Sequence, residues 1–169
     1  GSFYRGQGWD RQIVDKLETI SGVPAVATTP SVVEALKHLG SKKISVITPY
    51  PKWNNERLQE YLLDKGFDVL NINTPSDASE FSFNMCNHSP GVVLDYGLEK
   101  LLPEADTLLV SCTGWRSVEV IDELESRTGK MVVTANQATI WFMLEKLGWS
   151  KPIQGFGQLL SGQARIPVA

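Results

Sequence analysis

Residues 107–114 read TLLVSCTG, an apolar run that passes directly into a small polar turn. The first part, Thr107 to Ser111, has the length and composition of a buried strand. Lys43 to Thr48, with the sequence KISVIT, has the same character, and apolar residues at helical spacing lie between the two strands. Strands that alternate with helices indicate βαβ units and a mostly parallel sheet. The sequence therefore predicts an α/β fold.

The alternation continues on both sides of these two strands. Strands are predicted at 23–28, 43–48, 67–72, 107–111 and 131–134. Helices are predicted at 13–20, 30–39, 58–62, 92–102, 117–127 and 139–147. Residues 73–90 are polar and weakly periodic, which predicts a long loop or lid, and the tail is rich in glycine.

The composition excludes several classes of protein. The 169 residues are 42% hydrophobic and 21% charged, which is ordinary for a globular chain and unlike a disordered or coiled-coil one. A net charge of −3 without a basic run predicts no nucleic-acid partner. No apolar stretch approaches the ~18–20 residues of a membrane span, which predicts no membrane partner. Two cysteines are too few for a disulfide framework and favour a reducing, cytoplasmic location.

The edge where the strands end is the expected ligand site, because parallel sheets bind ligands beyond the carboxyl ends of their strands. Four short groups follow predicted strands there: Thr28-Thr29, Thr48-Pro49-Tyr50, Ser111-Cys112-Thr113-Gly114 and Thr134-Ala135-Asn136. They contain hydroxyls, a thiol and an amide but no charged side chain. Hydroxyls and backbone N–H groups can hold a carboxylate and can stabilise an enediolate made from it.

Cys112 is the residue with the clearest chemical potential. It follows a strand and precedes Gly114 and a predicted helix, so backbone N–H groups and the positive helix end are expected to favour its thiolate. Such a thiol serves as a nucleophile or as a proton donor and acceptor, and Tyr50 could donate a hydrogen bond to the same substrate oxygens. The structural alternatives are a small buried cysteine, a tyrosine ring packed between two prolines and, for Asn136, a helix cap.

Several known catalytic and cofactor patterns do not fit the sequence. A hydrolase elbow would need glycine where Val110 stands, and both histidines, His38 and His88, precede the cysteine. Cys86 and His88 form a single metal-type pair without a second pair, which predicts no metal site. The chain has neither a G-x-G-x-x-G motif nor a phosphate-binding loop, which predicts no nucleotide cofactor. The remaining prediction is cofactor-free chemistry on a small anion.

A set of short motifs is spread over nearly the whole chain. The motifs are Ser2-Phe3-Tyr4-Arg5-Gly6, Gly22-Val23-Pro24, Val33-Glu34-Ala35-Leu36, Leu39-Gly40, Thr48-Pro49-Tyr50, Asn55-Glu56-Arg57-Leu58, Ser111-Cys112-Thr113-Gly114, Ile121-Asp122-Glu123-Leu124-Glu125, Asn136-Gln137-Ala138, Trp141 and Gly155-Phe156-Gly157-Gln158-Leu159-Leu160. Together their order and spacing resemble the aspartate/glutamate racemase superfamily. The resemblance is strongest to the branch that contains arylmalonate decarboxylase and maleate cis-trans isomerase.

The resemblance implies a fold of two Rossmann-like α/β lobes, each with a parallel sheet, around a central cleft. It implies catalysis without a cofactor, by one cysteine from each lobe or by a single cysteine in the decarboxylase. Cys112 falls on the second-lobe cysteine, and Tyr50 falls on a tyrosine that contacts the substrate carboxylate. Thr113 and Gly114 fall on the loop whose N–H groups bind that carboxylate. We expect Thr48 and Ser111 to bind substrate beside them.

The resemblance also implies a division of the chain. Residues 42–136 correspond to the second lobe, and residues 1–41 and 137–169 correspond to a remainder of the first lobe. The family's first-lobe cysteine, or the Thr-Ser pair that replaces it in the decarboxylase, lies just before the Ser2-to-Gly6 stretch. We therefore expect an incomplete first lobe and a chain that is inactive alone. We expect it to associate with another copy or with the missing N-terminal part.

The predicted function is that of a cofactor-independent isomerase or racemase of a small mono- or dicarboxylate. Thr113 favours this alternative, whereas Gly114 and the Phe3-to-Gly6 stretch favour a single-cysteine decarboxylase. A non-catalytic binding domain is a further alternative, and the missing phosphate loop argues against a nucleotide- or flavin-binding domain. An activated Cys112 is expected to alkylate well below about pH 8, with protection by dicarboxylates.

Overall fold

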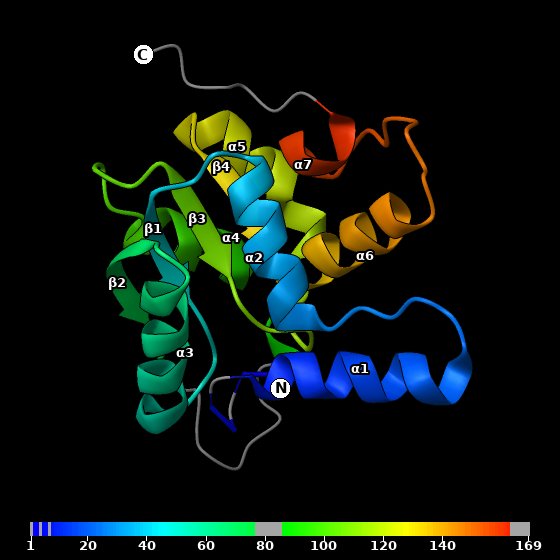
Figure 1. Ribbon diagram of the computed structural model, residues 1–169. Coiled ribbons are helices and arrows are strands. Elements are labelled where there is room, and N and C mark those ends of the chain that lie inside the picture. Colours follow the sequence, from blue (N-terminus) through cyan, green and yellow to red (C-terminus); the bar gives the residue numbers. More distant parts are fainter. Residues whose placement is uncertain (1, 4, 7, 77–85, 163–169) are drawn as a thin grey trace.

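A computed structural model describes residues 2–3, 5–6, 8–76 and 86–162 of the chain. Its centre is a four-stranded parallel sheet with the strand order β2-β1-β3-β4 (Figure 1). The strands are β1 (Lys43–Ile47), β2 (Asp68–Asn73), β3 (Thr107–Val110) and β4 (Met131–Thr134). The predicted α/β class with a parallel sheet is confirmed.

Helices cover both faces of the sheet. They are α1 (Trp9–Ser21), α2 (Thr28–His38), α3 (Lys52–Asp64), α4 (Pro90–Lys100), α5 (Ile121–Thr128), α6 (Ala135–Lys146) and α7 (Gly157–Ser161). The side chains of α2, α3 and α6 pack with Ile44 and Val46 of β1 in one core cluster. Those of α4 and α5 pack with Ile47 and Leu108 in the other. This alternation follows from the two-residue period of a strand whose two faces are both buried.

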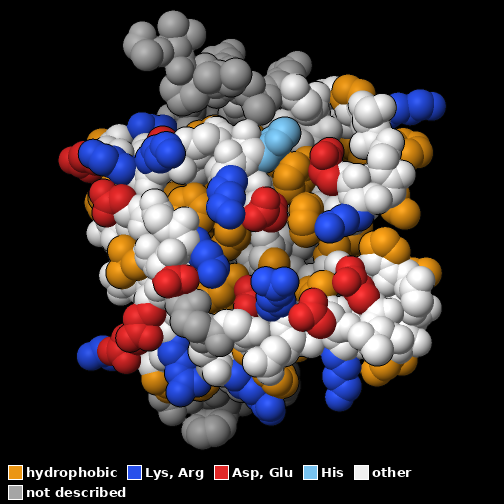
Figure 2. Space-filling model, in the orientation of Figure 1, with side chains coloured by type: hydrophobic (Ala, Val, Ile, Leu, Met, Phe, Trp, Pro, Cys, Tyr) orange, Lys and Arg blue, Asp and Glu red, His pale blue; other side chains and the backbone are white. Residues whose placement is uncertain are grey.

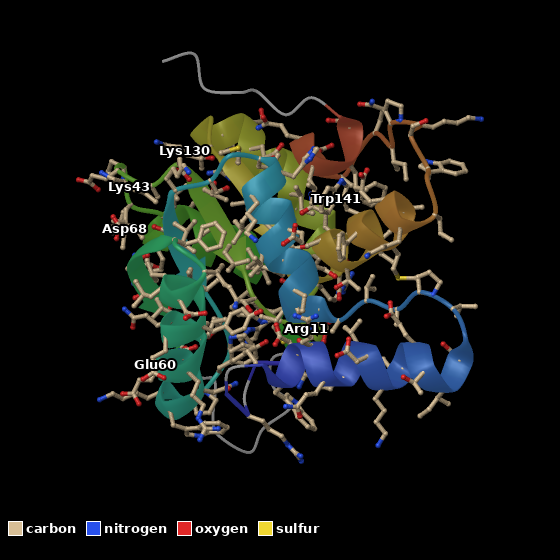
Figure 3. The ribbon with its side chains drawn as sticks, in the orientation of Figure 1. Arg11, Lys43, Glu60, Asp68, Lys130 and Trp141 are labelled. Atoms are coloured by element: carbon tan, nitrogen blue, oxygen red, sulfur yellow. The ribbon has the colours of Figure 1, made fainter. Side chains whose placement is uncertain are left out.

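The strand register brings the carboxyl ends of three strands to one edge. Ile47 at the end of β1 pairs with Val110 of β3, which pairs in turn with Thr134 of β4. The chain passes from β1 to β2 on one side and then returns to β3 on the other, so the ends of β1 and β3 flank the switch point where such sheets bind ligands. Figure 3 shows Lys43, Asp68 and Lys130 together at the opposite edge of the sheet.

The prediction of a strand at 23–28 is wrong. Residues 22–27 form no strand, and α2 begins at Thr28. An extended apolar segment becomes a strand only when its backbone pairs with a neighbouring strand. Here the N–H of Ala25 instead donates a 3.0 Å hydrogen bond to Oε1 of Glu18 on the preceding helix. The segment is therefore a linker between α1 and α2, and the sheet has four strands rather than five.

The other predicted elements are confirmed with shifted ends. Helix α6 begins at Ala135, directly after β4, because Thr134 and Gln137 form a capping box that starts the helix there. The Gly-rich tail contains the short helix α7. Half of the predicted loop or lid at 73–90 falls on residues 77–85, which lie outside the described residues. All four strands lie within 42–136, and the proposed lobe boundaries stay a prediction.

Candidate active site

Tyr50 and Cys112 meet at the switch point between β1 and β3. The Tyr50 hydroxyl makes side-chain hydrogen bonds with Ser111 and with Cys112. Cys112 is only 5% exposed, so its thiol lies beneath the surface of the carboxyl edge. Two residues that are 62 positions apart in the sequence are thereby brought together by the parallel pairing of β1 with β3.

The turn after β3 directs backbone N–H groups at the Cys112 sulfur. The N–H of Gly114 lies 3.3 Å from Sγ, and the N–H of Trp115 also hydrogen bonds to it. Both groups stabilise negative charge on sulfur, as does the Tyr50 hydroxyl. This part of the expected thiolate environment is therefore present.

The net effect on the Cys112 pKa is nevertheless upward. Burial raises the pKa of the thiol above its ordinary value, and the hydrogen bonds from Gly114, Trp115 and Tyr50 offset this only in part. The expected helix end is also absent from the thiol, because the 3₁₀-helix η2 (Val118–Val120) and α5 begin several residues later. The direction of this pKa shift runs against the expected thiolate, and an activated Cys112 stays a prediction.

Tyr50 is held as a hydrogen-bond donor. Burial and the neighbouring Cys112 raise the pKa of its hydroxyl well above the ordinary value of tyrosine. A phenol with such a raised pKa keeps its proton throughout the physiological range. Its ring packs near Phe3, with ring centroids 6.1 Å apart.

A network of hydrogen bonds from Thr48, Asn55 and Thr74 holds the backbone of Tyr50. Thr48 is fully buried; its hydroxyl donates to Oδ1 of Asn55 at 2.6 Å and accepts from the Tyr50 N–H at 3.0 Å. Asn55 and Thr74 each donate to the Tyr50 carbonyl oxygen, at 3.3 and 2.8 Å. The structure thus places Thr48 behind Tyr50, with its hydroxyl already engaged, rather than beside the other residues of the predicted site.

A small cavity of about 70 Å³ lies at this edge of the sheet. Tyr50, Ser111 and Thr113 line one side of it, and Ser2, Phe3, Thr28, Thr29, Val32, Leu58, Leu62 and Ala135 line the rest. The N-terminal side is held by Ser2, whose Oγ donates to Thr29 Oγ1 at 2.7 Å. At about 30 Å³ per water molecule, the cavity has room for a group the size of a carboxylate. Cys112 itself does not line it.

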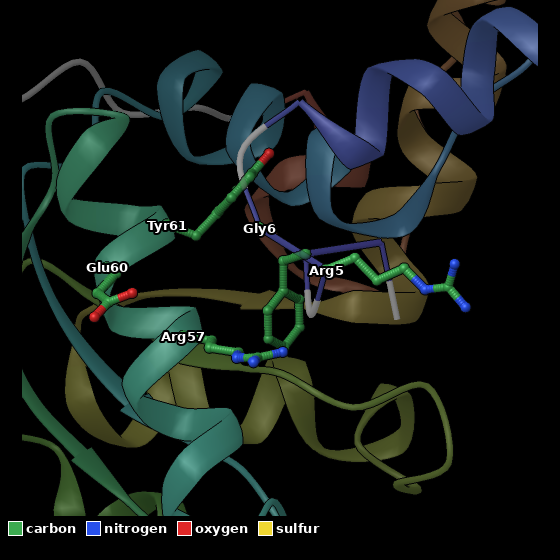
Figure 4. A pocket seen from close by; sticks show the side chains of 6 residues that line it. Arg5, Gly6, Arg57, Glu60 and Tyr61 are labelled. Carbon is green, nitrogen blue, oxygen red and sulfur yellow. The ribbon is translucent and has the colours of Figure 1, made fainter.

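A second cavity, of about 200 Å³, shares Phe3 with the first and is lined also by Arg5, Gly6, Arg57, Glu60 and Tyr61. Figure 4 shows Arg57 and Glu60 reaching from α3 while Arg5 points away from them. The Arg57 guanidinium lies over the Trp53 ring at 5.5 Å, and the Arg5 guanidinium lies over the Trp9 ring at 4.6 Å. No strand-end residue lines this cavity, so we place the candidate site at Tyr50 and Cys112.

Sequence reasoning missed the roles of two polar side chains. Asn136 does not cap α6; it donates from Nδ2 to the Thr113 carbonyl oxygen at 3.1 Å. His88 is buried, and its Nδ1 accepts a hydrogen bond from Nε1–H of Trp115 at a distance of 3.0 Å. The T-x-x-Q pattern of Thr134 to Gln137 signals the true cap, but no sequence signal pairs His88 with Trp115. Among the residues that the structure describes, no three metal-ligating side chains cluster together.

Comparisons with known proteins find similarity to arylmalonate decarboxylases and maleate isomerases. The family model described as arylmalonate decarboxylase matches residues 1–160. The maleate isomerase of Pseudomonas putida is 30% identical over 166 residues, which span 93% of this chain and 64% of that protein. The arylmalonate decarboxylase of Bordetella bronchiseptica is 25% identical over 159 residues, which span 94% of this chain and 66% of that protein.

A solved structure, that of the maleate isomerase Iso from Pseudomonas putida S16, superposes with a TM-score of 0.85 at 26% identity. It covers 94% of this chain and 65% of that one. The chain therefore spans slightly less than two thirds of the length of the curated relatives it matches.

Proposed function

The chain belongs to the arylmalonate decarboxylase family. On that premise we propose that it is part of an enzyme that isomerises small dicarboxylates such as maleate without a cofactor. The observation that carries the proposal is the meeting of Cys112 with two kinds of hydrogen-bond donor. These are the Tyr50 hydroxyl and the N–H groups of the turn at Gly114 and Trp115. The similarity to maleate isomerases supports this choice among the family's activities.

We propose that Cys112 acts as the nucleophile of the isomerisation. The thiol first loses its proton to solvent, and the thiolate then adds to one alkene carbon of maleate. The C=C π pair moves onto the neighbouring carboxylate, and an enediolate forms. Rotation about the resulting C–C single bond follows, and the pair returns to expel the thiolate and leave the trans isomer. No net proton or electron is consumed. Tyr50 and the backbone N–H groups would stabilise the negative charge as it develops.

A second candidate is a decarboxylase, and the raised Cys112 pKa favours it. Loss of CO₂ from a malonate leaves the same kind of enediolate, whose carbon must then take a proton. A buried thiol whose pKa is raised holds its proton more tightly and is suited to deliver it to that carbon. Tyr50 and the turn N–H groups would have the same role in both reactions. The two activities thus differ in whether Cys112 starts as thiolate or as thiol.

The test is to incubate the full-length protein, in which this chain is joined to the proposed missing polypeptide, with maleate and, separately, with an arylmalonate, and to follow each reaction by NMR. Formation of fumarate supports the isomerase, and formation of an arylacetate supports the decarboxylase. Cys112→Ala should abolish either reaction, whereas the matched variant Cys86→Ser, which changes an exposed cysteine, should retain it. Full activity in folded Cys112→Ala would refute the role of this thiol.

We also propose a protein partner for an apolar surface formed by α1 and α6. Leu17 and Ile20 on α1, Met143 on α6 and Leu147 at the C-cap of α6 are all substantially exposed. In the view of Figures 1 and 2 both helices lie on the right-hand side, where hydrophobic side chains reach the surface. Exposed apolar surface of this kind marks a contact site.

The occupant that we propose is polypeptide equivalent to the third of the relatives that the chain does not span. Light scattering on the chain and on an Ile20→Lys variant tests this proposal. A dimer that the variant dissociates would instead assign the surface to a second copy. A monomer in both cases leaves the surface free for the proposed polypeptide.

A cytoplasmic location completes the proposal. Cys86 and Cys112 are both free thiols, which fits a reducing compartment. None of the described helices is long and apolar enough to cross a membrane. Fractionation of cells that express the protein tests the location.

A further inference from the structure

The turn that carries the N–H donors to Cys112 is anchored by a buried histidine. Trp115, which is 2% exposed, supplies one of the N–H groups that face the Cys112 sulfur. Its indole Nε1–H donates to Nδ1 of His88 at 3.0 Å, and the two rings lie 6.0 Å apart between centroids. A single residue thus contacts Cys112 through its backbone and His88 through its side chain.

The anchor fixes the orientation of both groups. Because Nδ1 of His88 accepts the bond, its ring proton resides on Nε2. The bond is inaccessible to water, so neither the indole nor the imidazole can replace its partner with solvent at no cost. With its side chain held, Trp115 cannot rotate out of the core without breaking this bond, and its backbone N–H stays directed at the thiol.

We propose that His88 is a positioning residue for the catalytic turn: through Trp115 it holds the backbone N–H donors at the Cys112 sulfur. The proposal deepens the proposed function, since it concerns how the same thiol is controlled, and it rests on Cys112 being the reactive group. Loss of the anchor should loosen the turn and weaken the N–H contacts to sulfur. These contacts would then offset less of the rise in the Cys112 pKa that burial causes. Tyr50 and Cys86 are ionisable groups that also act on the Cys112 thiol.

The experiment measures the Cys112 pKa from the pH dependence of its alkylation by iodoacetamide, in a Cys86→Ser background where Cys112 is the only thiol. Trp115→Phe keeps an aromatic ring but removes the N–H donor, and His88→Leu removes the acceptor. Both should raise the Cys112 pKa, so that alkylation at neutral pH slows about 3- to 10-fold, given that one pKa unit is a tenfold change in thiolate. His88→Gln, whose amide oxygen can accept the indole N–H, should restore most of the rate.

The matched control is Trp149→Phe. It removes the same kind of indole bond, from Trp149 Nε1 to the Lys151 carbonyl oxygen at 2.9 Å, at an exposed place in the segment after α6. Unchanged alkylation in folded Trp115→Phe would overturn the proposal, as would equal slowing in Trp149→Phe. If Trp115→Phe does not fold, the pair His88→Gln and His88→Leu decides, and equal rates in that pair overturn it. The alkylation rate is measured without a substrate. The test of His88 can therefore still be interpreted if the activity assay shows no isomerase.

Discussion

Asn136 and the Cys112 sulfur form hydrogen bonds with opposite sides of the same peptide group, the one between Thr113 and Gly114. Asn136 donates from Nδ2 to the carbonyl oxygen of Thr113 at 3.1 Å, and the N–H of Gly114, in the same peptide plane, points at Cys112 Sγ from 3.3 Å. Since C=O and N–H point in opposite directions across a trans peptide, a bond at one end orients the other. The first turn of α6 therefore aligns an N–H donor of the candidate site.

Replacement of Asn136 should disturb the thiol in a graded way. Asn136→Ala frees the Thr113 carbonyl and should lower the neutral-pH alkylation rate of Cys112 a few-fold. Asn136→Asp places a carboxylate, which cannot donate, beside that carbonyl, and its charge raises the Cys112 pKa further. We expect the order native, Ala, Asp in decreasing rate. An Asp variant that reacts as fast as the native protein would contradict this alignment.

The pH dependence of Cys112 should reflect burial. Because burial raises its pKa in the folded protein, the alkylation rate of Cys112 in Cys86→Ser should reach half its maximum above about pH 8.5, the ordinary thiol value. The native state holds this proton more tightly than the unfolded state. The thiol's contribution to stability is therefore full below about pH 8.5 and is lost as the pH rises above it. A half-maximum below pH 8 would show an activated thiol instead.

Tyr50→Phe tests the hydroxyl that contacts the thiol. The variant keeps the ring that packs near Phe3, so the melting temperature should change little. It removes a donor that remains protonated because its pKa is raised. Loss of one donor to a developing oxyanion typically costs about 10²-fold in kcat, and we expect a loss of that order for maleate isomerisation. A kcat within about threefold of the native value would remove Tyr50 from the catalytic group.

The strands and the site edge were predictable because they depend on local sequence. In KISVIT and TLLVS, every strand position after the exposed Lys43 is buried, so these segments are rich in β-branched and apolar residues and show no alternation of buried and exposed positions. Parallel pairing then brings Tyr50 and Ser111 to one edge without further information. The segment at 23–28 has the same apolar character, yet whether it pairs depends on a neighbouring strand, which a local pattern cannot show.

The control of the site depends on contacts between distant segments. Asn55 reaches Thr74 across 19 residues, and His88 reaches Trp115 across 27. Neither side chain carries a local pattern that names its partner. The direction of the Cys112 pKa shift also depends on distant segments. The N–H groups near Cys112 in the sequence can be anticipated from the motif, whereas the burial that raises the pKa is a property of the whole core.

Thr48→Val should destabilise the fold through unpaired groups rather than lost volume. The substitution keeps the shape but removes the hydroxyl that serves Asn55 and the Tyr50 N–H. Buried polar groups left unpaired cost about 1–3 kcal/mol each, so we expect a loss of about 2 kcal/mol in urea unfolding. Thr139→Val removes a hydroxyl bonded only to a helix carbonyl and is expected to cost less than about 1 kcal/mol. Equal losses would argue against the network.

Gly157 and Gly162 form a matched pair that separates backbone strain from a steric clash. Both have positive φ, +75° and +68°, where a side chain costs roughly 1–2 kcal/mol. A Cβ on Gly162 would meet nothing within 4 Å, whereas one on Gly157 would clash with Cγ2 of Ile121. Gly162→Ala should therefore show the strain alone, and Gly157→Ala should add about 1–3 kcal/mol for overpacking.

The added loss in Gly157→Ala also has a specific structural consequence. The N–H of Gly157 donates to Oδ1 of Asp122 at 2.6 Å, and the N–H of Gln158 donates to Oε2 of Glu125 at 2.9 Å. A shift that relieves the clash with Ile121 moves the start of α7 away from both carboxylates. We therefore expect faster amide hydrogen exchange at Gln158 in Gly157→Ala but not in Gly162→Ala. Equal unfolding free energies in the two variants would show that α7 yields without strain on α5.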